Sequence, residues 1–278
     1  MSRQRIRCAA VVASACARAI PAAGQELDRT MVEWPYVGSD QAASKYSALA
    51  DIDASNVERL EVAWTWEPNE LPNREFQTRP GSFEVMPLMI DNIVYVSTMY
   101  SRVVALDAET GEELWAFDPE AWRTGPRGGP PGGFKHRGVA VWPAEGNRTV
   151  GAGDGMRVFI NSRDSLYALN AADGSLITSF GDDGRVLLTE NFPNPVTHEM
   201  FDQTSPPVVF EDLVIVGSRV PDRIQRRFDT PGSVQRSTST PASGAGSSTR
   251  CRSRTMRSGP TPGRAAPGAS PGTPTSGG

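Results

Sequence analysis

One internal repeat limits the fold of this chain more than any other feature of its sequence. The segment 103–117, VVALDAETGEELWAF, recurs 63 residues later as LYALNAADGSLITSF at 166–180. In each copy an alternating run rich in β-branched and aromatic residues leads into Asp-x-x-Thr-Gly or Asn-x-x-Asp-Gly, a turn whose glycine tolerates a positive φ. Each copy therefore predicts a strand, a turn and a second strand.

Further strands are expected upstream of both copies. They are MPLMIDNIVYVSTM at 86–99 and RVFINS at 157–162, so each unit has about four strands. Four short strands per unit are typical of β-propeller blades, here with long insertions. A third unit begins at 205–218, and its inner strand is expected just after Val234. We therefore predict an all-β fold, the first blades of a β-propeller, over residues 25–235.

The first 24 residues resemble a secretory signal peptide. Three arginines precede a short apolar run, and small residues follow it. The run is far shorter than the ~20 residues that a membrane-spanning helix needs, so no transmembrane segment is expected. Ala-Ser-Ala before Cys16 also resembles a lipoprotein cleavage box. Cys8 and Cys16 fall in this leader and Cys251 near the C-terminus, so the folded part has no cysteine, which suits an oxidising compartment.

Residues 236–278 differ in composition from the rest of the chain. They are mainly Ser, Thr, Gly, Pro, Ala and Arg, and Met256 is the only large apolar side chain. This segment buries too little apolar surface to offset its conformational entropy, so we expect it to be disordered. Its arginines lack interleaved aromatic residues, and the rest of the chain is acidic, so no nucleic-acid partner is expected.

A shift of reading frame would explain this tail. If suitable codons are chosen for Arg236 to Ser243 and are read from one base earlier, they spell Ala-Phe-Asp-Val-Asp-Thr-Gly-Glu, which continues the repeat in phase. A genuine Ser/Gly/Pro linker is the alternative, but it does not predict a repeat in phase. We therefore expect the chain to be out of frame after Gln235 and truncated as a propeller.

Several segments together resemble a known family, the quinoprotein dehydrogenases that use pyrroloquinoline quinone (PQQ), which are eight-bladed propellers. The resemblance covers about residues 32–235, and the glucose and polyol members are more similar than methanol dehydrogenase. Besides the two repeats, the segments that carry it are WPYVGSDQAASKYSALADIDASNVERLEVAWTW at 34–66, FEVMPLMIDNIVYVST at 83–98, HRGVAVW at 136–142, SFGDDGRV at 179–186 and TSPPVVFEDLVIVGS at 204–218.

The resemblance implies a periplasmic enzyme that oxidises a small-molecule alcohol, polyol or sugar by hydride transfer to PQQ. Calcium would act as a Lewis acid, and a quinone or cytochrome would accept the electrons. The family places its catalytic base in later blades, so no catalytic residue is named and the truncated chain is expected to be inactive. A non-catalytic scaffold propeller, like the outer-membrane assembly lipoproteins, is the alternative. It explains the blades and the leader but leaves the His-Arg-Gly-Val-Ala and Thr-Ser-Pro-Pro motifs without a role.

The resemblance also implies cofactor-binding residues. Arg137 matches the family's cofactor-binding arginine, and Glu84 matches a cofactor-contacting glutamate; the alternatives are a surface arginine and an edge-strand carboxylate. Ser162 stands where most members have threonine, with Asn161 as the neighbouring candidate.

Ser218 corresponds to a cofactor contact of the family. Asp222 corresponds to an acidic calcium ligand, with a solvated loop acid as the alternative. His136 and His198 are isolated histidines without metal-ligand spacing, and we interpret them as structural.

Overall fold

The computed structural model describes residues 33–126, 133–142, 155–190, 192, 196, 201–219, 232–238 and 252–255. The chain divides into the units Met1–Val32 and Glu33–Gly278, and all described residues lie in the second. The predicted signal peptide therefore lies outside the described residues. Apart from the strands, the described part has two short 3-10 helices, η1 (Val57–Arg59) and η2 (Ala121–Thr124). Within it, no helix has the length and apolar character to cross a membrane.

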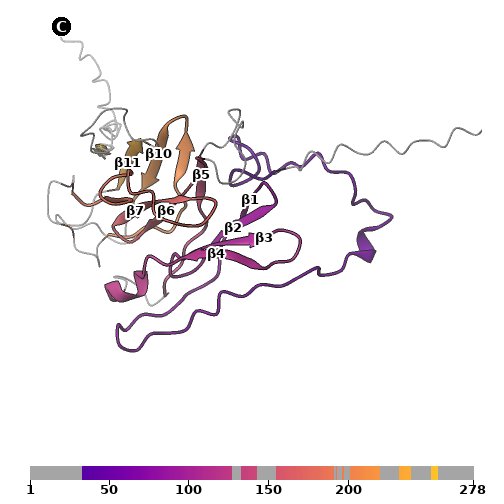
Figure 1. Cartoon of the computed structure of the whole chain (residues 1–278), viewed down its shortest axis with the longest axis horizontal. Helices are drawn as coiled ribbons and strands as arrows, with labels where there is room; N and C mark the ends of the chain where they lie inside the picture. Colours follow the sequence, from indigo (N-terminus) through magenta and orange to yellow (C-terminus); the bar gives the residue numbers. More distant parts are fainter. Residues whose placement is uncertain are drawn as a thin grey trace, which may run out of the picture. The chain divides into compact units, whose positions relative to one another are not determined.

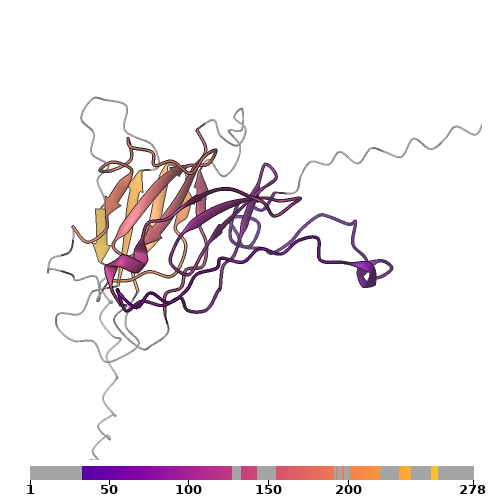
Figure 2. The ribbon, with the colours of Figure 1, turned by 60° about the horizontal axis from the view of Figure 1, so that its bottom comes forward.

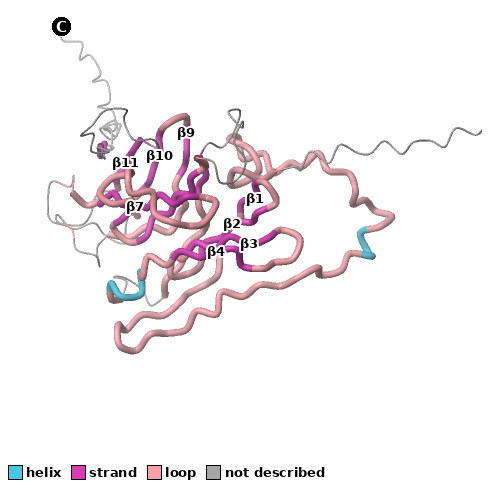
Figure 3. The backbone as a smooth tube through the Cα atoms, in the orientation of Figure 1, coloured by secondary structure: helices cyan, strands magenta, loops and turns pink. Residues whose placement is uncertain are grey.

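The strands form three four-stranded sheets, each antiparallel and each in chain order (Figure 1, Figure 3). The first sheet contains β1 (Leu88–Ile90), β2 (Ile93–Ser97), β3 (Val103–Asp107) and β4 (Glu113–Phe117). The second contains β5 (Ala140–Trp142), β6 (Arg157–Ser162), β7 (Ser165–Asn170) and β8 (Arg185–Leu187). The third contains β9 (Val208–Phe210), β10 (Leu213–Gly217), β11 (Ser233–Thr238) and β12 (Arg252–Thr255). The prediction of an all-β fold built from four-stranded units is confirmed.

The second sheet has a core on each of its faces, because side chains alternate along a strand. In β6, Val158 and Ile160 pack with residues of the first sheet, whereas Phe159 packs with residues of the third. Figure 2 shows strands of the second and third sheets, in salmon and orange, side by side. The alternation therefore places Asn161, the next residue of β6, on the face that carries Phe159.

Two tryptophans pack against the glycine of the repeat, Trp115 from the preceding sheet and Trp64 from the segment before the first sheet. Trp115 lies against Gly174, where an added Cβ would come within 2.4 Å of the indole ring, and its Nε1–H donates to the Ala171 carbonyl at 3.0 Å. Trp64 lies against Gly111 in the same way and donates to Ala108 at 3.1 Å. Both glycines have a positive φ, of 72° and 73°. The repeated glycine thus serves the turn and also the approach of the indole.

The second copy of the repeat departs from the prediction after its turn. Only Leu176 forms a bridge, to Leu169, and the fourth strand of this sheet is β8 instead of residues 174–180. The amide of Phe180 bonds the carbonyl of Ile177, so the chain turns here. Phe180 is fully buried, 5.5 Å from Phe159 between ring centroids. Packing of this ring into the core therefore replaces the strand.

Part of the tail that was expected to be disordered belongs to the third sheet. Residues 236–238 complete β11, and 252–255 form β12. The remainder of the tail lies outside the described residues. Backbone pairing with β10 explains the strand at 236–238, since ladder hydrogen bonds do not require particular side chains.

The side chains of β11 do not suit their places in this sheet. Val214 pairs with Ser237 as Val94 pairs with Leu106 and Val158 with Leu169. Ser237 is 2% exposed, and its hydroxyl has no hydrogen-bond partner among the described residues. A polar serine therefore occupies a position at which both other sheets bury leucine.

We predict that Ser237→Leu raises the free energy of unfolding by about 1–3 kcal/mol, because it removes an unpaired buried hydroxyl and buries apolar surface instead. Urea denaturation of the full chain measures this. Arg236→Ala is the control: this exposed residue stands where the other sheets have Ala105 and Ala168, and its replacement is expected to change stability by less than about 0.5 kcal/mol. A loss of stability in Ser237→Leu would contradict the correspondence between the sheets.

Candidate functional site

The candidate site forms where the chain enters the first strand of each sheet. Glu84 precedes β1, Arg137 precedes β5 and Thr204 precedes β9. The Met86 amide donates to the Arg137 carbonyl at 2.9 Å, which joins the first two of these segments. Gly138, with a φ of 147°, permits this approach, because an added Cβ would come within 2.9 Å of the Met86 carbonyl oxygen. The glycine of His-Arg-Gly is therefore required by the neighbouring backbone.

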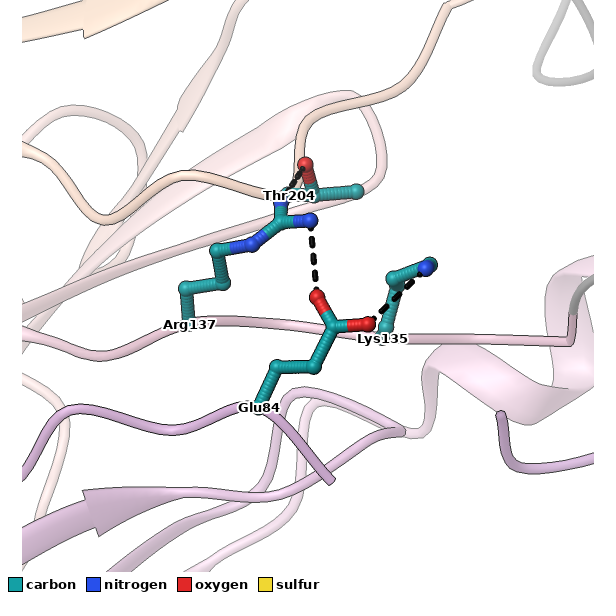
Figure 4. Close-up of polar contacts among 4 residues, drawn as sticks. All are labelled: Glu84, Lys135, Arg137 and Thr204. Atoms are coloured by element: carbon teal, nitrogen blue, oxygen red, sulfur yellow. Dashed lines mark hydrogen bonds and ion pairs between the residues drawn. The ribbon is translucent and has the colours of Figure 1, made fainter. Parts of the chain in front are cut away.

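A charged cluster of four side chains occupies this place (Figure 4). The Glu84 carboxylate accepts a hydrogen bond from Lys135 Nζ at 3.0 Å and forms an ion pair with Arg137 Nη2 at 2.7 Å. The other terminal nitrogen of Arg137, Nη1, donates to Thr204 Oγ1 at 2.5 Å. The hydrogen bond from Lys135 is the main cause that lowers the pKa of Glu84, and the charge of Arg137 adds to it.

The cluster keeps an excess of positive charge. Two cations face one carboxylate, and the charged side chains are each about one-third exposed, with 28% for Lys135, 32% for Glu84 and 35% for Arg137. Thr204 accepts from Arg137, so its own hydroxyl hydrogen can be donated to another acceptor. Such a group can bind a carboxylate-bearing ligand from solvent.

A second, buried layer of polar side chains contacts the same segments. His136 lies between Lys135 and Arg137 in the chain and is 1% exposed. Its Nδ1 lies 3.1 Å from Ser97 Oγ, and its Nε2 lies 3.3 Å from Asn161 Oδ1. The Asn161 amide in turn donates to Gln203 Oε1 at 2.5 Å and to the Ser205 carbonyl at 3.0 Å. This layer, called the buried network below, includes residues from all three sheets or the segments next to them.

The hydrogen bonds determine the tautomer of His136. Both amide hydrogens of Asn161 are donated, so its Oδ1 faces the histidine and accepts from Nε2–H. Nδ1 is then the acceptor for the Ser97 hydroxyl and for the Gly138 amide at 3.4 Å. Burial lowers the pKa of His136 to about 4, so the ring is neutral at pH 7.

The structure brings together some of the predicted residues and not others. Glu84 and Arg137 are in direct contact, whereas Asn161 belongs to the buried network. Ser162 is buried at the end of β6, and among the described residues no hydrogen bond links it to Glu84, Arg137 or Thr204. Ser218 follows β10 and accepts a hydrogen bond from the Ser233 amide at 2.8 Å, so it links β10 to β11.

Two other predicted residues, Asp222 and His198, lie outside the described part of the chain. Within it, no group of three or more His, Cys, Asp and Glu side chains could hold a metal ion.

Lys135 and Thr204 were not among the predicted site residues. Lys135 is two residues from Arg137, and in an extended segment residues at i and i+2 point to the same side. That spacing was an available signal for Lys135. Thr204 was noted only as part of a motif, and nothing local indicates its contact with Arg137, 67 residues earlier.

We predict that falling pH destabilises the fold between about pH 6.5 and 4 through His136. The unfolded chain takes up a proton near pH 6.5, whereas the folded chain does so only near pH 4, so stability is present above this window and is lost as the pH falls through it. The expected loss is roughly 3 kcal/mol across the window.

Urea denaturation at a series of pH values measures this dependence. The His136→Gln variant is the comparison: its stability should change much less between pH 6.5 and 5, where few carboxylates titrate. Parallel curves for the wild type and this variant would contradict the prediction.

Known proteins are similar to this chain in sequence from the segment before the first sheet to the first part of β11. Residues 34–236 match the PQQ family model described as "Glucose/ethanol/alcohol dehydrogenase, beta-propeller domain". Quinoprotein glucose dehydrogenase of Escherichia coli (strain K12) is 30% identical over 214 residues, which are 73% of this chain and 25% of that protein. Quinohemoprotein alcohol dehydrogenase of Comamonas testosteroni is 34% identical over 197 residues, which are 67% of this chain and 22% of that protein.

A solved structure agrees with these matches. The crystal structure of the Comamonas testosteroni quinohemoprotein alcohol dehydrogenase superimposes with a TM-score of 0.53 and 26% identity, over 75% of this chain and 26% of that one. The chain thus spans about a quarter of the length of these relatives. Because the family model covers most of the chain, including all three segments of the site, this chain belongs to the PQQ-dependent glucose and alcohol dehydrogenase family of β-propellers.

Proposed function

We propose that this chain provides the first three blades, and one part of the cofactor site, of a PQQ-dependent dehydrogenase that oxidises an alcohol, polyol or sugar hydroxyl. The observation that carries this proposal is the cluster of Glu84, Lys135, Arg137 and Thr204. It is assembled from the entry segments of three consecutive sheets, and it has one more cation than anion.

The side chains of this cluster fit the chemistry of the cofactor. PQQ is a tricarboxylate that, when bound, accepts a hydride at a quinone carbonyl carbon. Arg137 would donate to a carboxylate through its planar guanidinium, Lys135 would add a second positive charge, and Thr204 would donate its hydroxyl hydrogen. Glu84 would hold both cations in place and limit their net charge. Ser162 and Ser218 stay proposed contacts on the strength of the family resemblance, as does Asp222 for calcium.

The names of two relatives support two alternative classes of electron acceptor. One relative is the quinate/shikimate dehydrogenase (quinone) of Acinetobacter baylyi, and another is the 1-butanol dehydrogenase (cytochrome c) of Thauera butanivorans. We propose a quinone or a cytochrome as the acceptor for this chain. The resemblance of residues 1–24 to a signal peptide supports export to the periplasm.

We also propose that the residues after Gln235 are translated out of frame, so that the 278-residue chain is inactive. The pairing of β11 supports this. Arg236 and Ser237 stand where β3 has Ala105 and Leu106 and β7 has Ala168 and Leu169, although the backbone pairing itself continues in phase. Reading one base earlier would restore alanine and phenylalanine at positions 236 and 237.

Titration with PQQ tests the cofactor site. In a frame-restored protein we expect Arg137→Ala to weaken PQQ binding by at least about tenfold, because a charge-assisted hydrogen bond is lost. Arg123→Ala is the matched control, since Arg123 is 55% exposed and is paired with Glu120. Absence of binding by the restored wild type would refute the proposed function. Equal binding by Arg137→Ala and the wild type would remove Arg137 from the site.

Sequencing of the DNA across codons 225 to 280 tests the frame. We expect one base to be missing near codon 235 and the restored frame to continue through further repeats. An unbroken frame as written would mean that the tail is genuine, and it would favour a binding or scaffold role for this chain.

A further inference from the structure

We propose that His136 is a positioning residue of the cofactor site: its imidazole holds together, from the buried side, the segments that carry Arg137 and Thr204. This inference rests on the proposed function, because the residues that it positions are the proposed cofactor ligands. It assigns a specific task to a histidine that the sequence pattern alone marks only as structural.

The first argument is the alternation of side chains in the entry segment of the second sheet. Lys135 and Arg137 both reach Glu84, whereas His136 between them points into the protein and is 1% exposed. The amide of Gly138, on the other side of Arg137, also approaches the imidazole, at 3.4 Å from Nδ1. The Arg137 backbone therefore lies between the residue that carries the imidazole and an amide that approaches it.

The same arrangement holds Thr204. Gln203 and Ser205, its two neighbours, both accept hydrogen bonds from the side-chain amide of Asn161. That amide is oriented by the contact of Asn161 Oδ1 with His136 Nε2. His136 thus contacts the backbone around Arg137 directly and the backbone around Thr204 through one residue.

A third contact reaches the first sheet. The Ser97 hydroxyl, at the end of β2, lies 3.1 Å from Nδ1 of the imidazole. His136 therefore has partners in the first and second sheets and, through Asn161, next to the third. These are the sheets whose entry segments provide Glu84, Arg137 and Thr204.

Holding these segments together requires a rigid side chain with a hydrogen-bond acceptor on one side and a donor on the other, which an imidazole provides. Nδ1 accepts from Ser97 and Gly138, while Nε2–H donates to Asn161. Leucine would fill much of the volume but would leave the buried Asn161 and Ser97 side chains each without this partner. Glutamine can reproduce the donor side only, so it should restore part of the effect.

The consequence of losing the ring falls on the site. The Arg137 side chain is 35% exposed and has only Glu84 and Thr204 as side-chain partners in the described part of the chain. If its backbone and that of Thr204 move independently, the guanidinium loses the fixed orientation in which it would receive a carboxylate. His136 does not itself touch the proposed ligand position.

The test compares three variants of the full chain, namely His136→Leu, His136→Gln and, as a control, Leu169→Ala. Leu169 is fully buried in β7 and lies outside the buried network, so its variant loses stability without losing the histidine. One readout is the solvent-exchange rate of the Arg137 Nη–H resonances in NMR, which contact Glu84 and Thr204 and are assigned by their absence in Arg137→Lys. The other readout is the affinity for PQQ of the frame-restored protein that carries the same substitutions.

We expect His136→Leu to raise the exchange rate and to weaken PQQ binding, each by about tenfold, whereas His136→Gln recovers a large part of both. Leu169→Ala should leave both unchanged while it lowers the denaturation midpoint. If His136→Leu behaves as the wild type in the exchange experiment, or if Leu169→Ala produces the same changes, the positioning role is overturned. Failure of the frame-restored wild type to bind PQQ would refute the proposed function instead, and the exchange rates in the 278-residue chain would still decide the role of His136.

Discussion

The site depends on one property of extended backbone, which is that successive side chains point to opposite sides. In Lys135-His136-Arg137 this property places two cations against Glu84 and one imidazole in the interior. In Gln203-Thr204-Ser205 it places the Thr204 hydroxyl beside Arg137 and the buried Gln203 side chain against Asn161, which also donates to the Ser205 backbone carbonyl. Two extended segments thus form an accessible charged layer and a buried neutral layer at the same time. A single-residue shift of either segment would exchange the two layers.

The sequence predicted the sheets well, because their information is local. The repeated turn and the alternating apolar residues lie within short windows, and the observed strands β2, β3, β6 and β7 follow them. The failure at residues 174–180 has a physical reason: the Phe180 ring packs into the core, and the chain turns there instead of forming a strand. The site was predicted only in part. Glu84 and Arg137 came from the family resemblance, but the buried network joins residues 25 to 44 positions apart, and no local pattern indicates such contacts.

The third sheet shows how far backbone pairing alone can extend a fold. β11 keeps the pairing of β3 and β7 although Ser237 occupies a leucine position and exposed Arg236 an alanine position. Hydrogen bonds of the ladder are insensitive to side-chain type, whereas the core is not. A strand with the right pairing and unsuitable side chains can therefore form and still contribute little stability. Composition predicted disorder here because it indicates only how much apolar surface a segment can bury. It gives no information on backbone hydrogen bonds to a neighbouring strand.

The two indole contacts also set an order of assembly. Trp115 donates to Ala171, 56 residues later, and Trp64 donates to Ala108, 44 residues later. On a ribosome, a tryptophan therefore emerges well before the carbonyl and the glycine that it needs. The first sheet, although complete in its own strands, keeps an uncovered indole until residues 166–174 have been synthesised. The first sheet is thus completed by the second, and a pause in translation between them would expose apolar surface to chaperones or to other nascent chains.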